Sequence, residues 1–157
     1  MPSPVDLGLQ AVFEELKEAG ANLPDPAEVG VEEGRAARAR YYAYLNQPDG
    51  ELPVDEVRDV TIEGPHGPFR LRLYFPTGER PAPVTVFIHG GGWWTGDVPA
   101  YDQICRRLAA ESGCAVASVE YRLWPEHRFP VPVDETMAVA EWVLNQGAEH
   151  GLDPSRI

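Results

Sequence analysis

The sequence predicts an α/β fold whose sheet begins with antiparallel strands and continues with parallel ones. Three observations support this prediction. The 16 prolines leave long windows without proline, and helices and central strands avoid proline in their interiors. Apolar residues recur at helical spacing in the first two windows, whereas residues 57–75 alternate between apolar and polar side chains. Two later stretches, 84–88 and 115–119, are almost continuously apolar and flank a helical pattern, as in a parallel strand–helix–strand unit.

Two amphipathic helices are expected before the sheet. In window 5–23, one helical face collects four apolar residues: Leu9, Val12, Phe13 and Leu16. Gly20 can end this helix, because glycine readily adopts the left-handed conformation that closes a helix. In window 27–47, a second helical face collects Ala37, Tyr41, Tyr44 and Leu45. We expect residues 1–50 to form a helical segment and residues 51–157 to form part of the α/β core.

A β-hairpin is predicted next. Val60 and Ile62 alternate with polar neighbours, and so does a second set of apolar residues: Phe69, Leu71, Leu73 and Phe75. Between them, residues 64–68 read Gly-Pro-His-Gly-Pro, which is a strong turn signal. The pattern indicates an antiparallel pair with one buried face, and His66 is expected as a solvated turn residue at its tip.

The remaining elements alternate between strand and helix. The apolar stretches 84–88 and 115–119 suit strands that are covered on both faces. The helix between them has an apolar stripe of Tyr101, Ile104, Cys105, Leu108 and Ala109. Gly113 is expected to end it. A last helix is predicted over residues 133–147, with Asp134 and Glu135 in its first turn, where negative charge is favourable. Its apolar stripe would be Val133, Thr136, Met137, Ala140, Val143 and Leu144.

Composition excludes several classes of function. Thirteen basic and 25 acidic side chains give a net charge of −12, which disfavours binding to nucleic acid and to anionic membranes. No stretch approaches the length of a membrane span, and the first ten residues do not resemble a secretory leader. Cys105 and Cys114 match no zinc or redox spacing, so we expect buried free thiols in a cytoplasmic protein. We expect no metal and no cofactor.

The residues with catalytic potential follow the strand at 84–88. They read His-Gly-Gly-Gly-Trp-Trp-Thr-Gly over positions 89–96. In open α/β sheets, ligands bind beyond the carboxyl ends of the strands. Gly90, Gly91 and Gly92 lack a Cβ, so their backbone can approach a ligand closely and aim N–H groups at a developing negative charge. This pattern indicates an oxyanion hole.

Two motifs in the expected order resemble the hormone-sensitive-lipase family of esterases and lipases. Residues 89–93 are similar to its HGGG oxyanion motif, and residues 120–127, Glu-Tyr-Arg-Leu-Trp-Pro-Glu-His, to its D-Y-R-L-A-P-E-H segment. Residues 151–157 continue the resemblance, and Glu120 and Trp124 depart from it. The resemblance implies a serine esterase on an α/β-hydrolase fold, a short- to medium-chain ester substrate, and a cap formed by residues 1–50.

The resemblance also assigns roles to single residues. The backbone N–H groups of Gly91 and Gly92 are the implied oxyanion donors. The substrate-binding residues are Gly90, Trp93 and Trp94. A further group is expected to support the loops without taking part in the chemistry: His89, Tyr121, Arg122, Pro125 and Glu126.

The nucleophile of this family is missing from the sequence. It sits in a G-x-S-x-G elbow, and none of the four serines (Ser3, Ser112, Ser118 and Ser155) has that setting. The triad is therefore expected beyond Ile157, and the chain is interpreted as an incomplete esterase that is inactive alone. The strand at 84–88 would be left as an exposed edge, so we expect instability, a homodimer or a complementing C-terminal chain.

Two other functions stay open. The same loop could bind a small molecule without turnover, because the deciding residues would lie past Ile157. A dinucleotide site is a second alternative, since Gly90, Gly92 and Gly96 follow a strand and Glu120 ends the next. However, this glycine spacing is one residue longer than the fingerprint, and two tryptophans fill the space that a pyrophosphate needs.

Overall fold

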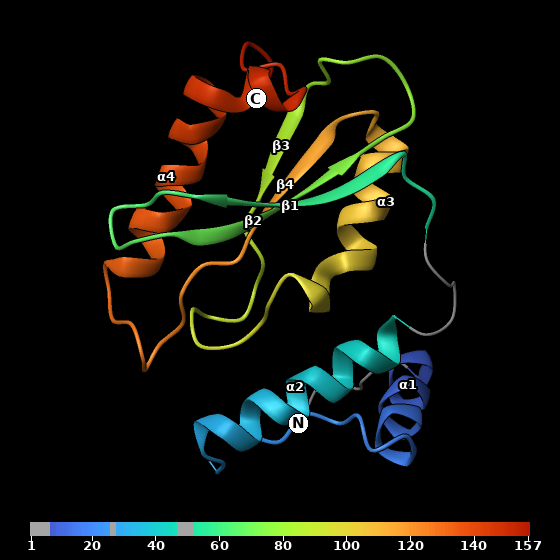
Figure 1. Ribbon diagram of the computed structural model, residues 1–157. Coiled ribbons are helices and arrows are strands. Elements are labelled where there is room, and N and C mark those ends of the chain that lie inside the picture. The colour runs from blue at the N-terminus through green and yellow to red at the C-terminus, as the bar shows by residue number, and fades with distance from the viewer. Residues whose placement is uncertain (1–6, 26–27, 47–51) are drawn as a thin grey trace. The chain divides into compact units, whose positions relative to one another are not determined.

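The computed structural model describes residues 7–25, 28–46 and 52–157. The chain divides into two compact units, Met1–Gly50 and Glu51–Ile157, which are described in turn. The first unit contains two helices and the second contains a sheet with helices (Figure 1).

The first unit contains helices α1 (Leu7–Glu18) and α2 (Val31–Leu45), as predicted. Gly20 adopts a φ of +66° and donates to the Lys17 carbonyl, while the next N–H donates to the Leu16 carbonyl. This pair of bonds is the Schellman arrangement that closes a helix. Arg40 Nε donates to the Gly20 carbonyl at 3.3 Å, and the Tyr44 hydroxyl donates to Glu15, so the two helices are bonded to each other. Of the predicted apolar face of α1, Leu16 is buried, whereas Leu9, Val12 and Phe13 remain about half exposed.

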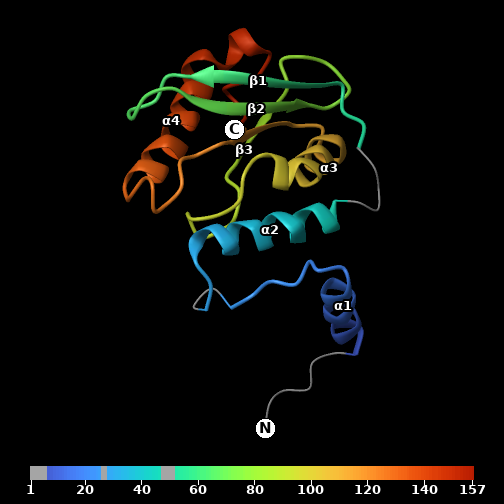
Figure 2. The same ribbon diagram turned by 60° about the horizontal axis from the view of Figure 1, so that its bottom comes forward.

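The second unit is built on a mixed sheet of four strands in the order β1-β2-β4-β3. The strands are β1 (Glu56–Ile62), β2 (Phe69–Phe75), β3 (Val84–Phe87) and β4 (Ala115–Val119). β1 pairs antiparallel with β2, and the arrows of these two strands point in opposite directions in Figure 2. β4 also pairs antiparallel with β2, while β3 pairs parallel with β4. This mixed sheet confirms the predicted fold class.

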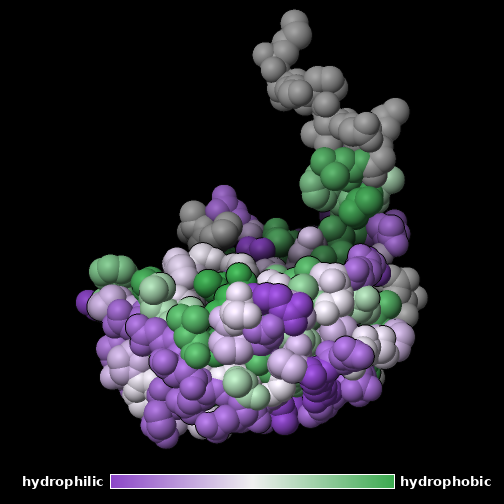
Figure 3. Space-filling model, turned by 90° about the horizontal axis from the view of Figure 1, so that it is seen from above, coloured by the Kyte–Doolittle hydropathy of each residue, from purple (hydrophilic) through white to green (hydrophobic). Residues whose placement is uncertain are grey.

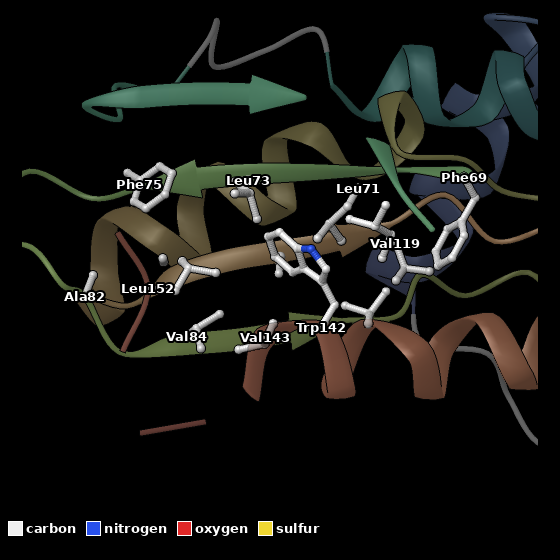
Figure 4. Close-up of a cluster of buried hydrophobic side chains, with 14 of the residues drawn as sticks. Phe69, Leu71, Leu73, Phe75, Ala82, Val84, Val119, Trp142, Val143 and Leu152 are labelled. Carbon is white, nitrogen blue, oxygen red and sulfur yellow. The ribbon is translucent and has the colours of Figure 1, made fainter. Parts of the chain in front are cut away.

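Two helices cover opposite faces of the sheet (Figure 1). Helix α4 (Val131–Gln146) packs Val139, Trp142 and Val143 against the face that carries Leu71 and Leu73. Figure 4 shows Trp142 and Val143 between this helix and the strands. Helix α3 (Asp102–Ser112) packs on the other face, where Cys105 and Ala109 meet Tyr74 and Val116. Two short 3-10 segments, η1 (Pro99–Tyr101) and η2 (Gly147–His150), flank these helices. Gly113 ends α3 with a φ of +69°, as predicted.

The predicted bounds and face of the last helix were wrong. Helix α4 begins at Val131, two residues earlier than expected, with Pro132 in its first turn. Proline is tolerated there because the N–H groups of the first turn have no partner within the helix. The buried face is Pro132, Glu135, Thr136, Val139, Trp142 and Val143. Met137 and Leu144, which were assigned to the core, are more than half exposed.

The hairpin tip agrees with the expectation, since His66 is an exposed turn residue. Its Nε2 also lies 2.7 Å from Asp134 Oδ2, so it contacts the first turn of α4. Both cysteines are free, but only Cys105 is buried, and burial raises the pKa of its thiol to about 11. The face shown in Figure 3 mixes hydrophilic areas with smaller hydrophobic ones.

Strand β3 is less buried than a strand covered on both faces. Only Val84 is buried, and Ile88, directly after the strand, is 48% exposed. In the described part of the chain β3 pairs with β4 on one side, which makes it an edge strand, as expected. On the side of β3 that does not face β4, the N–H of its first residue, Val84, donates to the Arg156 carbonyl at 2.9 Å. Residues 151–157 therefore run beside the start of β3.

Candidate active site

The glycine loop follows the carboxyl end of β3 and has an unusual backbone. Gly91, Gly92 and Gly96 have φ values of +132°, +60° and +93°, and Trp93 has a φ of +66°. A Cβ on Gly91 would lie 1.9 Å from the Thr95 carbonyl oxygen, and one on Gly96 would lie 2.5 Å from the Gly90 carbonyl oxygen. Glycine is therefore required at these two positions by close backbone contacts as well as by conformation.

The N–H groups of Gly91 and Gly92 donate no hydrogen bond within the residues that the structure describes. The hydrogen bonds that close this turn go to the Gly91 carbonyl. It accepts one from the Trp94 N–H at 3.3 Å and one from the Thr95 N–H at 3.2 Å. Gly92 is also exposed. Two adjacent backbone donors on an exposed turn can bind an oxygen atom that carries negative charge.

His89 anchors the beginning of this loop. Its side chain is buried and stacks on the Tyr121 ring, with ring centroids 4.1 Å apart and an angle of 13° between the planes. The Tyr121 hydroxyl donates to the His89 carbonyl at 2.8 Å and lies 3.1 Å from His89 Nδ1. Nδ1 is also 3.0 Å from the Gly90 carbonyl, which can only accept, so we assign the proton to Nδ1. Burial lowers the pKa of His89 below its ordinary value, although the bond to Gly90 opposes this shift.

The segment 120–127 lies against the glycine loop. The Trp124 N–H donates to the Trp93 carbonyl at 2.8 Å, and the Trp93 and Tyr121 rings lie 5.0 Å apart. Glu120 accepts hydrogen bonds from the Val98 N–H at 3.2 Å and from Arg70 at 2.9 Å. The two segments that the sequence singled out are thus brought together by direct backbone and ring contacts.

The other predicted residues lie around these contacts. Trp93 is 41% exposed and Trp94 is partly buried, so both sit at the rim of the loop. Pro125, which follows a cis peptide bond, and Glu126 are exposed. They occupy a tight turn in which the His127 N–H donates to the Leu123 carbonyl at 2.9 Å.

Sequence reasoning missed Glu135 as part of this site. It was assigned only to a favourable helical turn, but its carboxylate is fully buried and binds Arg122 through both the backbone N–H and the guanidinium. A signal was present, because Glu135 shares a helical stripe with Val139, Trp142 and Val143. The large Trp142 favoured that stripe over the one chosen.

The described residues contain neither a candidate metal site nor a candidate membrane-spanning helix. Within the described ranges, no three or more His, Cys, Asp and Glu side chains are grouped in a way that would hold a metal ion. No helix in those same ranges is both long and apolar enough to cross a bilayer.

Comparisons with known proteins agree with the geometry. A family model described as an α/β hydrolase fold matches residues 85–157, which include the glycine loop and segment 120–127. The chain is 36% identical over 136 residues to the esterase LipI and 40% identical over 124 residues to the carboxylesterase NlhH, both from Mycobacterium tuberculosis. It superposes on the hyperthermophilic esterase from the archaeon Pyrobaculum calidifontis with a TM-score of 0.88 at 35% identity.

The chain has an α/β-hydrolase fold and resembles the hormone-sensitive-lipase-like family of esterases. The predicted resemblance is therefore confirmed, and the relatives are esterases by name. The matches cover 84% of this chain for LipI, 77% for NlhH and 99% for the archaeal structure. In the other direction the chain spans less than half of each relative: 42%, 38% and 48%.

Proposed function

We propose that this chain supplies the oxyanion-binding part of a carboxylic-ester hydrolase. The observation that carries the proposal is the pair of unpartnered N–H groups of Gly91 and Gly92 in the described residues. They lie on the loop directly after β3, where α/β sheets bind their ligands. Relatives named carboxylesterase and acetyl esterase support an ester as the substrate.

The chemistry assigns a definite task to these donors. A serine Oγ attacks the ester carbonyl carbon, and the carbonyl oxygen becomes an oxyanion held by the two N–H groups. Collapse of this intermediate expels the alcohol and leaves an acyl-serine. Water then attacks the acyl-serine, forms a second oxyanion at the same place and releases the carboxylic acid. Each donor contributes about 2.7–4 kcal/mol to the stabilisation of the transition state in a hole of this kind.

The nucleophile, its base and its acid come from residues other than these 157. Ser118 is buried in β4, Ser112 Oγ donates to the Leu108 carbonyl, and Ser155 Oγ donates to Asp153. Ser3 lies outside the described residues. The chain is therefore inactive by itself and acts in a complete enzyme, by which we mean the polypeptide or complex that joins it to the nucleophile.

The substrate is a carboxylic ester with a short to medium acyl chain. Trp93 and Trp94 lie beside the two donors at the loop rim, where aromatic rings can line the acyl site and Gly90 leaves the backbone accessible. No cofactor takes part in this reaction. The N-terminal unit, residues 1–50, serves as a cap, and the core begins at residue 51.

The test is hydrolysis of p-nitrophenyl acetate and butyrate by the complete enzyme, combined with a fluorophosphonate that labels activated serines. We expect turnover and one labelled serine in a G-x-S-x-G setting. Binding of the esters without turnover or labelling would contradict the hydrolase and favour a non-catalytic small-molecule binder. The intact mass of the native protein shows whether the nucleophile belongs to the same polypeptide.

A further inference from the structure

Glu135 is a fully buried carboxylate on the face of α4 that packs against the sheet. Both of its oxygens bind Arg122. Oε2 accepts a hydrogen bond from the Arg122 backbone N–H at 2.8 Å, and Oε1 accepts one from the guanidinium. The guanidinium also donates through Nη2 to the Pro68 carbonyl at 3.0 Å. The carboxylate thus fixes the peptide group between Tyr121 and Arg122, in addition to pairing with a charge.

The segment that Glu135 holds is bonded to both ends of the glycine loop. The Tyr121 hydroxyl donates to the His89 carbonyl, and the Trp124 N–H donates to the Trp93 carbonyl, each at 2.8 Å. These two carbonyls belong to the residues directly before Gly90 and directly after Gly92. The position of residues 121–124 therefore sets the peptide planes on either side of the glycine N–H groups.

We propose that Glu135 is a positioning residue for the oxyanion loop and acts through Arg122 and Tyr121. This proposal rests on the proposed function, in which Gly91 and Gly92 donate to the oxyanion. Glu135 itself does not bind the substrate. Its carboxylate holds the 121–122 peptide, Tyr121 and Trp124 then hold the loop, and the loop presents its two donors in one orientation.

A purely stabilising role explains this carboxylate less well. Burying a charge carries a desolvation cost that its ion pair only partly offsets, and apolar residues of similar volume are often equally stable or more stable. An apolar residue cannot, however, accept the hydrogen bond of the Arg122 backbone N–H. Both carboxylate oxygens of Glu135 bind Arg122, one of them at the backbone. This arrangement fits a residue that fixes the position of the Arg122 backbone.

The adjacent Asp134 provides a matched control. It is the preceding residue of the same helical turn, its side chain is 38% exposed, and it binds His66 of the hairpin turn at 2.7 Å. A substitution at Asp134 removes an acidic group and its contact with His66 from α4 without touching the contacts of Arg122.

The test measures kcat, KM and melting temperature in the complete enzyme and its variants, with short p-nitrophenyl esters. We expect Glu135→Ala to lower kcat by about 10- to 100-fold while KM changes little, because a displacement of about 1 Å in a reacting group costs up to about 100-fold. Glu135→Gln keeps an oxygen that can accept the Arg122 N–H and should retain most of kcat. The double variant Glu135→Leu/Arg122→Met should lower the melting temperature less than Glu135→Ala does but should not recover kcat, and Asp134→Ala should keep kcat.

The outcomes separate this proposal from the proposed function. If the apolar pair restores both melting temperature and kcat, Glu135 has only a structural role and the proposal is wrong. If the unaltered enzyme does not hydrolyse esters, the proposed function fails instead. The positioning role is then decided by backbone ¹⁵N relaxation in ¹⁵N-glycine-labelled protein: Gly91 and Gly92 should have lower order parameters in the Glu135→Ala variant than in Asp134→Ala. Equal order parameters would overturn it.

Discussion

The Tyr121 hydroxyl donates a hydrogen bond to the His89 carbonyl at 2.8 Å while the two rings stack at 4.1 Å. One tyrosine therefore holds both the side chain and the backbone of the residue that begins the glycine loop. Tyr121 and His89 are 32 positions apart in the sequence and come from the ends of β4 and β3, which are parallel neighbours in the sheet. The sheet thus brings together the two motifs on which the proposed function depends.

Replacing Tyr121 by Phe tests this contact. The variant keeps the stacked ring but leaves the buried His89 carbonyl without its donor, which costs about 1–3 kcal/mol of the free energy of unfolding. We expect kcat of the complete enzyme for short esters to fall by about 10-fold or more, since the loop loses one of its two attachments. Steady-state kinetics and thermal unfolding check the result. An unchanged kcat would show that Tyr121 does not control the donors.

The substitutions Gly92→Ala and Gly113→Ala form a matched pair that tests the glycine loop. Both residues have left-handed φ values, +60° and +69°, and an added Cβ meets no atom closer than 3.5 Å at either. Each substitution should destabilise by about 1–2 kcal/mol, the cost of a left-handed residue with a side chain. Only Gly92→Ala should lower kcat, because the strain of a side chain at this left-handed φ turns the peptide that carries the Gly92 N–H, whereas Gly113 ends α3 and lies outside the loop. Equal kcat in the two variants would contradict a dependence of the reaction on the backbone conformation at Gly92.

The sequence predicted the strands, the hairpin and the glycine loop because each of them depends on local patterns. Alternation identified β1 and β2, glycine content identified the loop, and two motifs identified the family. Other features depend on which of two similar faces packs against the sheet. Asp134 and Glu135 are adjacent acids in one turn, yet the first binds an exposed histidine and the second is fully buried. Periodicity fits both stripes of α4, and only the packing of Trp142 decides between them.

His89 should titrate below the ordinary histidine range. Burial lowers its pKa, and the folded state therefore binds the ring proton less readily than the unfolded chain. Lowering the pH through about 6.5 should consequently favour the unfolded state. Long-range ¹H–¹⁵N spectra of the histidine rings measure both the midpoint and the tautomer. We expect a neutral ring protonated at Nδ1 at pH 7, and a midpoint at or above 6.5 would contradict this environment.

Asp153 should make the protein sensitive to acid at lower pH. Hydrogen bonds from Ser155 and Arg156 lower the pKa of this carboxyl to about 2 from its ordinary value of 3.8. The stabilisation is present above the unfolded value and is lost as the pH falls towards 2. Between pH 4 and 2, the free energy of unfolding should therefore fall less steeply in Asp153→Asn than in the unaltered protein. Denaturant unfolding at several pH values measures this difference, and parallel curves would refute the assignment.

The free edge of β3 leads us to predict that the isolated chain associates with itself. Beyond the bond between the Val84 N–H and the Arg156 carbonyl, this edge carries apolar side chains, and Ile88 beside it is 48% exposed. Exposed apolar edges pair with other chains, whereas a lysine on the edge opposes such pairing. We expect the isolated chain to self-associate and Ile88→Lys to reduce the association measured by sedimentation velocity. Leu144→Lys is the control, because it places the same charge at a 57% exposed apolar position on helix α4 instead of at the end of the strand. A monomeric sample with a sharp, reversible thermal transition would show that the edge needs no partner.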